Sequence, residues 1–276
     1  MKSIPLILAT VMLPVATIGY GQSEKSAAIA DRNPPTNATP MKTGVQRFLN
    51  IGEITADQVD TCKKLFAAVP AVVEADLKAA HIRNMTCFLK EIDGKHYIFN
   101  YLEYDGKDLE HDMGPNLFAK GASKSWGKSL LALISLPGKQ DQWSDVEEVF
   151  FTAGAADVVP TAGKYARTGM ITGLKPEKEA EYRTLHATTW PGVLRGIKNC
   201  NYRDFSIKLV GLEGKLYLIG YLEYVGKDPD ADAAAGKALP VNKRWWKFTD
   251  ACQQPLPAAA AKGEIWDGMT EIYHLD

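Results

Sequence analysis

The stretch YLEYDGKDLEHD, residues 101–112, is followed 120 positions later by YLEYVGKDPDAD, residues 221–232, and eight of the twelve positions are identical. Flanking segments align at about the same offset: residues 82–100 with residues 202–220, and residues 142–152 with residues 265–275. Self-similarity at a fixed spacing is the signature of a repeated structural unit. The chain is therefore predicted to contain the same unit twice, over residues 43–155 and 164–276.

The residue pattern of the second unit predicts an alternation of strands and helices. Strands are expected over residues 167–173, 205–210, 215–225 and 269–275, and helices over residues 175–199 and 230–249. This βαββαβ order is the ferredoxin-like pattern, whose antiparallel sheet carries helices on one face only. The face of each sheet that carries no helices must pack against another element, and the sheets of two units in one chain can pack against each other. The predicted fold class is therefore α+β, with two tandem ferredoxin-like (βαββαβ) units packed sheet to sheet.

The N-terminal segment has a different composition from the two units. Residues 1–21 combine Lys2 with an apolar run and a small-residue Gly-Tyr-Gly end, the pattern of an export signal peptide. An uncleaved membrane anchor is the alternative, because signals and anchors grade into each other. Residues 22–42 are polar and contain three prolines, which predicts a flexible linker. The mature protein is thus expected to be exported, periplasmic or extracellular, and without a membrane attachment.

Composition excludes several functional classes. The 276 residues carry a formal net charge of −1, so nothing indicates a surface for nucleic acid. Four cysteines, Cys62, Cys87, Cys200 and Cys252, have no metal-ligand spacing and are predicted to be mostly free, buried thiols. No glycine-rich phosphate loop is present. No metal and no cofactor are therefore expected.

The predicted first helix of the second unit, KPEKEAEYRTLHATTWPGVLRGIK at residues 175–198, carries the first candidate site residues. Tyr182 and His186 are four residues apart, so their side chains are neighbours on one helix face. Pro191 cannot donate a backbone hydrogen bond, so the helix should bend near Trp190 and open space beside His186. The alternative is a core histidine held by a single hydrogen bond.

A tryptophan pair, Trp245-Trp246, is the second candidate feature. Adjacent residues on a helix point about 100° apart, so one indole can pack into the core while the other faces a ligand. Indole faces bind the C–H faces of sugars and cations. The alternative is two interior tryptophans without a ligand.

These residues make the second unit similar to the L-rhamnose mutarotase family. The matching strings are GLKPEKEAEYRTLHATTWPGVL, LYLIGYLEYVG, KRWWKFTDACQQPLP and the terminal EIYHLD, in family order. The resemblance implies a dimeric α/β-barrel fold, here within one chain, so that a monomer forms a pseudo-dimer. It also implies interconversion of the α and β anomers of a 6-deoxy-hexose such as L-rhamnose. His186 then matches the catalytic acid/base, and Tyr182, Trp245 and Trp246 match residues that bind the sugar.

The sequence departs from the family pattern at two places. A second sugar-binding tyrosine of the family is replaced by Phe205, which puts the substrate preference in question. In the first unit, Leu65 or Phe66 stands opposite His186, and neither side chain titrates. The first unit is therefore expected to be a structural half with a closed or inert pocket. One active site per chain is predicted, built mainly from residues 164–276.

The chemistry of mutarotation agrees with these residue types. Opening a pyranose ring removes the proton of the anomeric hydroxyl and delivers one to the ring oxygen, and histidine can do either near neutral pH. The expected partner is a small-molecule monosaccharide. Two alternatives stay open: a non-catalytic sugar-binding or assembly module, and a small oxygenase on the same pair of sheets.

Overall fold

The computed structural model describes residues 44–114, 117–118, 121–135, 146–158 and 166–276. The predicted signal peptide, residues 1–21, and the predicted linker, residues 22–42, lie outside the described residues. The elements of the first half are β1 (Gln46–Ile54), α2 (Val59–Ala67), α3 (Ala71–Ala79), β2 (Ile82–Ile92), β3 (Lys95–Tyr104), α4 (Leu109–Asp112), α5 (Gly121–Leu133) and β4 (Glu147–Gly154). Those of the second half are β5 (Ala166–Leu174), α6 (Glu179–Ala187), α7 (Pro191–Asn199), β6 (Tyr202–Leu212), β7 (Lys215–Tyr224), α8 (Pro229–Ala238), α9 (Pro240–Cys252), β8 (Gln253–Gln254), α10 (Pro257–Ala260), β9 (Asp267–Gly268) and β10 (Thr270–Leu275).

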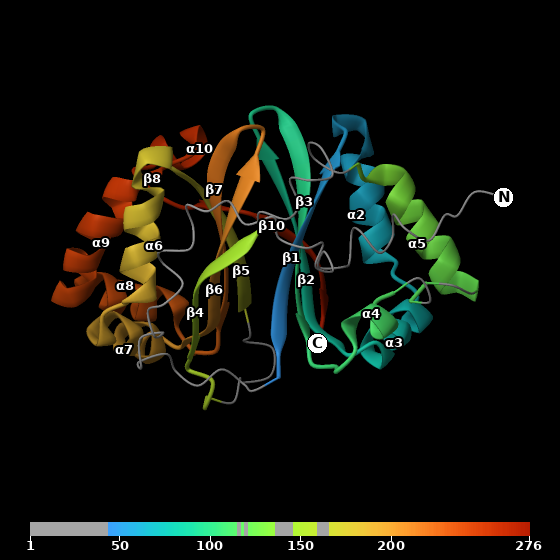
Figure 1. Cartoon of the computed structure of the whole chain (residues 1–276), viewed down its shortest axis with the longest axis horizontal. Coiled ribbons are helices and arrows are strands. Elements are labelled where there is room, and N and C mark those ends of the chain that lie inside the picture. Colours follow the sequence, from blue (N-terminus) through green and yellow to red (C-terminus); the bar gives the residue numbers. More distant parts are fainter. Residues whose placement is uncertain (1–43, 115–116, 119–120, 136–145, 159–165) are drawn as a thin grey trace, which may run out of the picture.

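Two antiparallel sheets stand face to face in the middle of the molecule, with helices on both outer sides (Figure 1). The first sheet has the strand order β1-β3-β2-β10, and helices α2, α3 and α5 lie outside it. The second sheet has the order β4-β6-β7-β5-β8, with α6 to α9 outside it. The α+β class and the sheet-to-sheet packing are therefore as predicted.

The two halves do not form self-contained ferredoxin-like units, which corrects the prediction. Strand β4 closes the first half in sequence but pairs with β6 of the second sheet, and β10 pairs with β2 of the first sheet. Each sheet is thus completed by the closing strand of the other half. Two Arg–Glu pairs link the exchanged closing strands to the opposite sheet: Arg47 with Glu148, and Arg167 with Glu271. Each pair is joined through two guanidinium–carboxylate hydrogen bonds. Such bidentate pairs fix geometry as well as adding energy.

The repeated YLEY segment lies where the two sheets meet. The rings of Tyr101 and Tyr221 are stacked with centroids 3.8 Å apart and planes 10° apart. Both tyrosines are buried within one apolar cluster, whose members lie in strands of the two sheets except for Leu256. They are Leu49, Ile51, Phe88, Ile92, Tyr97, Phe99, Tyr101, Ile171, Val210, Leu212, Tyr217, Ile219, Tyr221 and Leu256. Strands buried on both faces read as nearly continuous apolar runs, and β3 and β7 do so.

Backbone features recur at the predicted offset of 120. Both central hairpins turn through two residues of positive φ, Asp93-Gly94 in one and Glu213-Gly214 in the other. Two consecutive positive φ angles suit the right-handed twist of a hairpin, and glycine adopts the second without steric cost. The strands after α3 and α7 also carry register shifts at matching places, Arg83/Thr86 and Arg203/Ser206. Duplication of one ancestral unit stays a prediction.

Prolines divide both predicted helices of the second half. The expected helix over residues 175–199 is two helices, α6 and α7, with the break before Pro191 where the sequence predicted it. The stretch over residues 230–249 is also two helices, α8 and α9, which the sequence analysis did not predict. Pro240 occupies the first turn of α9, where its missing N–H costs nothing and its fixed φ starts a new helix.

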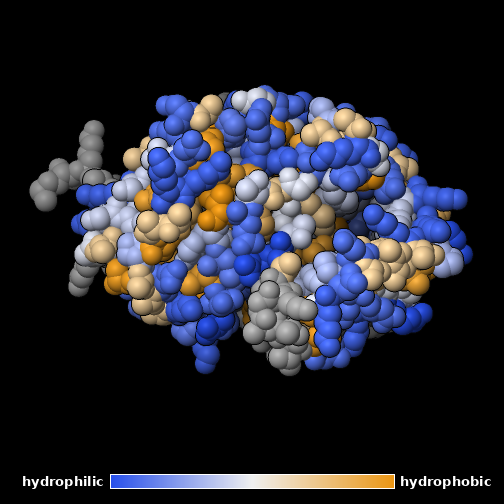
Figure 2. Space-filling view, turned by 180° about the vertical axis from the view of Figure 1, so that it is seen from behind, coloured by the Kyte–Doolittle hydropathy of each residue, from blue (hydrophilic) through white to orange (hydrophobic). Residues whose placement is uncertain are grey.

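The face of the molecule opposite to that of Figure 1 is largely polar. Hydrophilic side chains cover most of the face seen in Figure 2, and hydrophobic ones form small separate patches. The four cysteines are free and buried, as predicted. Within the described ranges, no helix has both the length and the apolar character needed to cross a membrane.

Candidate functional site

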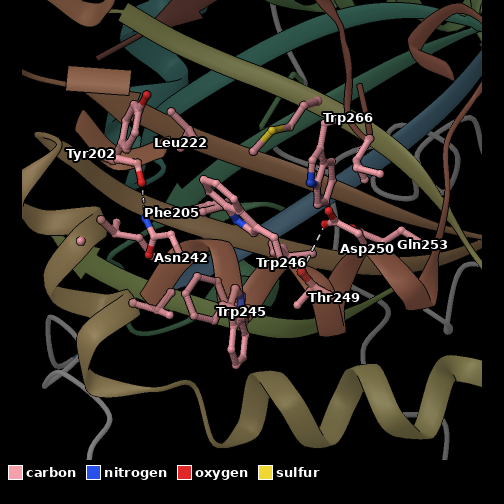
Figure 3. A pocket seen from close by; sticks show the side chains of 18 of the residues that line it. Tyr202, Phe205, Leu222, Asn242, Trp245, Trp246, Thr249, Asp250, Gln253 and Trp266 are labelled. Atoms are coloured by element: carbon pink, nitrogen blue, oxygen red, sulfur yellow. Dashed lines mark hydrogen bonds between the residues drawn. The ribbon is translucent and has the colours of Figure 1, made fainter. Parts of the chain in front are cut away.

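A pocket of about 620 Å³ lies between the second sheet and the helices that cover its outer face (Figure 3). Its walls are mostly aromatic and aliphatic, with polar groups spaced along them. The five residues singled out from the sequence all line this pocket: Tyr182, His186, Phe205, Trp245 and Trp246. The tertiary structure therefore brings together residues that are up to 64 positions apart in the sequence.

Local sequence keeps this space open. Helix α6 ends at Ala187 and α7 begins at Pro191, so the segment between them is not helical and Thr189 faces the pocket. Gly236 on α8 also lines it, and a Cβ there would lie 2.8 Å from the Cys200 sulfur. Any larger residue at position 236 would push Cys200 out of place.

His186 is held among aromatic rings. Its ring centroid is 4.1 Å from that of Tyr182 and 5.4 Å from those of Phe150 and Trp245. Its Nδ1 lies 3.1 Å from the backbone carbonyl oxygen of Tyr182. Because a carbonyl oxygen only accepts, Nδ1 carries the proton, which leaves Nε2 of the neutral ring with a free lone pair. The hydrogen bond to the Tyr182 carbonyl thus selects the tautomer in which Nε2 is unprotonated.

The surroundings of His186 favour its neutral form. Burial lowers the pKa of the imidazole to about 4, against the smaller opposing effect of the hydrogen bond to the Tyr182 carbonyl. Burial raises the pKa of the Tyr182 phenol well above its usual range. At neutral pH the pocket therefore holds an uncharged base beside an uncharged phenol.

We expect His186 to titrate near pH 4, and this titration to make stability depend on pH. The unfolded chain binds this proton below a pH of about 6.5, and the folded chain only near 4, so stability falls as the pH drops between these values. NMR of the imidazole resonances measures the titration, and urea unfolding at pH 5 and pH 7 measures the stability. The His186→Gln variant should lose less stability between these two pH values. An imidazole that titrates above pH 6 would contradict the prediction.

The two tryptophans differ in exposure but share the pocket. Trp245 is 5% exposed and contacts the rings of His186 and Trp190, whereas Trp246 is 37% exposed. The helical spacing allows one indole to be buried while the other faces a ligand, and the family resemblance implied that both bind the sugar. Both line the pocket, because it is wide enough to reach two adjacent positions of α9.

Sequence reasoning missed several residues of the site. Phe150 comes from β4 of the first half and reaches His186 only through the exchange of closing strands. Trp266 and Asp250 come from the second half, and Figure 3 shows them on the same side of the pocket. Asp250 lies four residues after Trp246 on α9, a spacing that could have indicated a shared face.

The corresponding region of the first half is filled. Phe66, at the offset position of His186, packs against Trp126 at 5.7 Å and against Tyr273 of β10 at 5.6 Å. The cavity beside Phe66 measures only about 10 Å³. That is the space of about one water molecule. Phe66 is thus packed in a region too small for a sugar, whereas His186 lines an open pocket.

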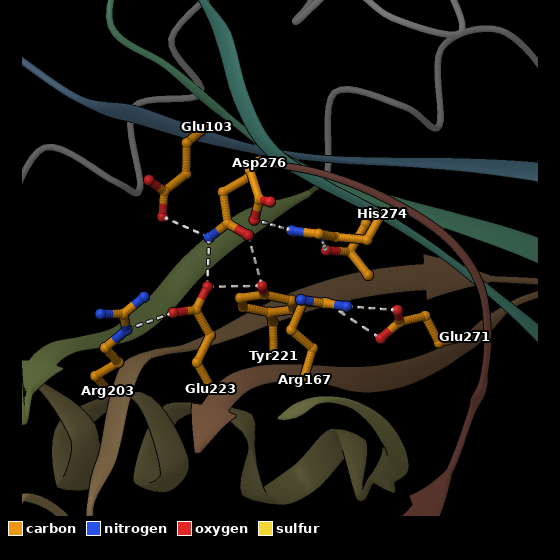
Figure 4. A network of polar contacts seen from close by, with 10 residues as sticks. Glu103, Arg167, Arg203, Tyr221, Glu223, Glu271, His274 and Asp276 are labelled. Carbon is orange, nitrogen blue, oxygen red and sulfur yellow. Dashed lines mark hydrogen bonds and ion pairs between the residues drawn. The ribbon is translucent and has the colours of Figure 1, made fainter. Parts of the chain in front are cut away.

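His274 lies away from the pocket, in a cluster of polar side chains between the two sheets (Figure 4). Its Nδ1 is 2.9 Å from the Thr86 hydroxyl oxygen, and its Nε2 is 2.8 Å from an Asp276 carboxylate oxygen. Nearby, Glu223 is fully buried and accepts hydrogen bonds from Arg203 and Asn84. This cluster joins the closing strand β10 to both sheets.

The geometry defines a two-sheet α+β protein whose second half carries an aromatic, helix-covered pocket around a neutral histidine. Residues 167–275 match the family model of L-rhamnose mutarotase, so this C-terminal part of the chain is similar to that family. The L-rhamnose mutarotase of Oceanobacillus iheyensis is 26% identical over 110 residues, which are 40% of this chain and 98% of the relative. That of Leptothrix cholodnii is 27% identical over 103 residues, 37% of this chain and 90% of the relative.

Among solved structures, similarity extends over most of the chain but is distant. A protein assigned as a monooxygenase in Fusobacterium nucleatum has a TM-score of 0.47 and 10% identity, over 86% of this chain and 96% of its own. An anthrone oxidase-like protein has a TM-score of 0.39 and 14% identity, over 85% of this chain and 92% of its own. These likenesses are too distant to carry an argument about chemistry.

Proposed function

We propose that this chain is an isomerase that interconverts the α and β anomers of a 6-deoxy-hexose such as L-rhamnose. The observation that carries the proposal is His186, a neutral imidazole with its proton fixed on Nδ1, lining an aromatic pocket that could hold a monosaccharide. The match of residues 167–275 to the L-rhamnose mutarotase family model supports the activity of a sugar mutarotase. Pockets of this volume are usual for small-molecule sites.

In the proposed reaction, the sugar ring lies against the indoles of Trp245 and Trp246, whose faces suit its C–H groups. His186 Nε2 takes the proton of the anomeric hydroxyl while a second acid gives a proton to the ring oxygen, and the bond between C1 and the ring oxygen breaks. The open-chain aldehyde turns about its C1–C2 bond and closes on the other face. Histidine returns the proton in the closing step.

Exchange between anomeric protons, measured by saturation-transfer NMR, tests the function directly. Addition of the protein to L-rhamnose should speed exchange well above that of the buffer alone, and a panel of other aldoses should react more slowly. Sugar binding without faster exchange would instead favour the non-catalytic sugar-binding module.

Phe205 is the residue expected to tune substrate preference. It lines the pocket with its ring 5.4 Å from that of Phe150, and it lacks the hydroxyl of the tyrosine found in the resembling family. Phe205→Tyr should supply a hydrogen bond to the sugar worth about 1 kcal/mol, which raises kcat/KM for L-rhamnose several-fold. Phe248→Tyr, on the exposed side of α9, is the matched control. Equal effects of the two substitutions would argue against a sugar contact at position 205.

We also propose that the enzyme is exported. The support is the sequence of residues 1–21, with its basic start, apolar run and small-residue end. An exported mutarotase would act on free sugars outside the cytoplasm. Cell fractionation with N-terminal sequencing tests this, and a cytoplasmic protein that retains residues 1–21 would contradict it.

A further inference from the structure

The pocket holds a second group suited to proton transfer. Two carboxyl side chains line it among the described residues: Asp250, which is half-buried, and Glu264, which is exposed. Asp250 projects from the last turns of α9, four residues beyond Trp246 and on the same face. In Figure 3 its carboxylate lies beside Trp266, and the Thr249 hydroxyl donates a long hydrogen bond of 3.5 Å to it.

The reaction needs a second proton-transfer group because only one nitrogen of His186, Nε2, is available to exchange a proton with the sugar. Its Nδ1–H is held by the Tyr182 carbonyl, so Nε2 is its one site for a proton. Opening the ring needs a base at the anomeric hydroxyl and an acid at the ring oxygen. Tyr182 is poorly suited to either role, since it is 1% exposed and its phenol has a pKa well above the usual range.

Asp250 lines the same pocket as His186. Burial, and then the charges of Cys252 and Asp250, raise the pKa of Tyr182, whose ring centroid lies 4.1 Å from that of His186. Burial raises the pKa of Asp250 itself, and the hydrogen bond from Thr249 has a smaller, opposite effect. The raised pKa favours the protonated form of the carboxyl group. The other titratable side chains lining the pocket are Cys200, Tyr202, Lys237 and Glu264.

We propose that Asp250 is the acid that protonates the ring oxygen while His186 acts as the base. This assignment rests on the proposed function. As Nε2 takes the hydroxyl proton, the O–H bonding pair forms the C1=O1 double bond. The C1–O5 bonding pair moves to O5, which takes the proton from the Asp250 carboxyl. Ring closure reverses each transfer, so that Asp250 ends protonated and His186 ends neutral.

The test compares Asp250→Asn with Glu177→Gln, a carboxyl-to-amide change at an exposed position outside the pocket lining. Asp250→Asn should slow anomeric exchange of L-rhamnose about a hundredfold. The Kd of the sugar, measured by calorimetry, should stay within about threefold because asparagine still accepts hydrogen bonds. Glu177→Gln should keep the parent rate within about twofold.

The pH profile separates proton transfer from a structural role. The parent rate should rise above the pKa of His186 and fall above that of Asp250, and the fall should be absent in Asp250→Asn. If the variant does not fold, rescue of Asp250→Ala by formate gives the same information, because formate supplies a carboxyl group. An Asp250→Asn rate within twofold of the parent, an unchanged pH profile, or no rescue would overturn the assignment. A parent that speeds exchange of no aldose would overturn the proposed function, and this assignment with it.

Discussion

Replacing His186 with alanine should slow anomeric exchange by a factor of about 10² to 10⁴, the usual contribution of a positioned acid or base. The methyl group leaves the pocket without its Nε2 base, while Trp245, Trp246 and Tyr182 still line the place where the sugar is proposed to bind. The rate should therefore fall through kcat, and the Kd of L-rhamnose should change little. Saturation-transfer NMR gives the rate and calorimetry gives the Kd.

His111→Ala is the control for this substitution, because that side chain is exposed on α4, in the first half of the chain. It should keep the parent rate. His186→Ala with the parent rate would show that the base lies elsewhere, and a loss confined to the Kd would make His186 a binding residue.

The second large effect is expected from Tyr221→Ala, in the interface between the sheets. Tyr221 is 3% exposed, stacks on Tyr101, and its hydroxyl lies 2.8 Å from Asn84 Oδ1 and 2.9 Å from a Glu223 carboxylate oxygen. Truncation of a buried aromatic side chain costs about 3–5 kcal/mol. That is a large share of the 5–15 kcal/mol that stabilises most domains. Urea unfolding followed by circular dichroism measures the loss.

Tyr221→Phe separates packing from hydrogen bonding. It keeps the stacked ring and removes the hydroxyl that binds the Asn84–Glu223 pair, so we expect a loss of about 1–3 kcal/mol. If both substitutions cost the same, the stacked ring adds nothing and the polar cluster alone holds the interface. Because β10 and both sheets meet here, Tyr221→Ala should also loosen the closing strand.

Much of the site was predictable because it depends on short-range spacing. Tyr182 and His186 are one helical turn apart, and Pro191 breaks the helix through its missing N–H whatever surrounds it. Asp250 was not predicted, since a carboxyl near the end of a helix is common and only the pocket gives it a role. Phe150 could not be predicted at all, because it belongs to a strand of the other half.

The sequence by itself determined the self-similarity at an offset of 120, the alternation of strands with helical segments, and the apolar faces that make two sheets meet. Periodicity and turn residues are local, so the chain carries them without its tertiary structure. Only the tertiary structure decided which sheet each closing strand joins. An edge strand satisfies its backbone hydrogen bonds equally well on either sheet, and the choice rests on contacts between distant segments, such as Arg47 with Glu148 and Phe150 with His186. The same packing left a pocket beside His186 and filled the region around Phe66.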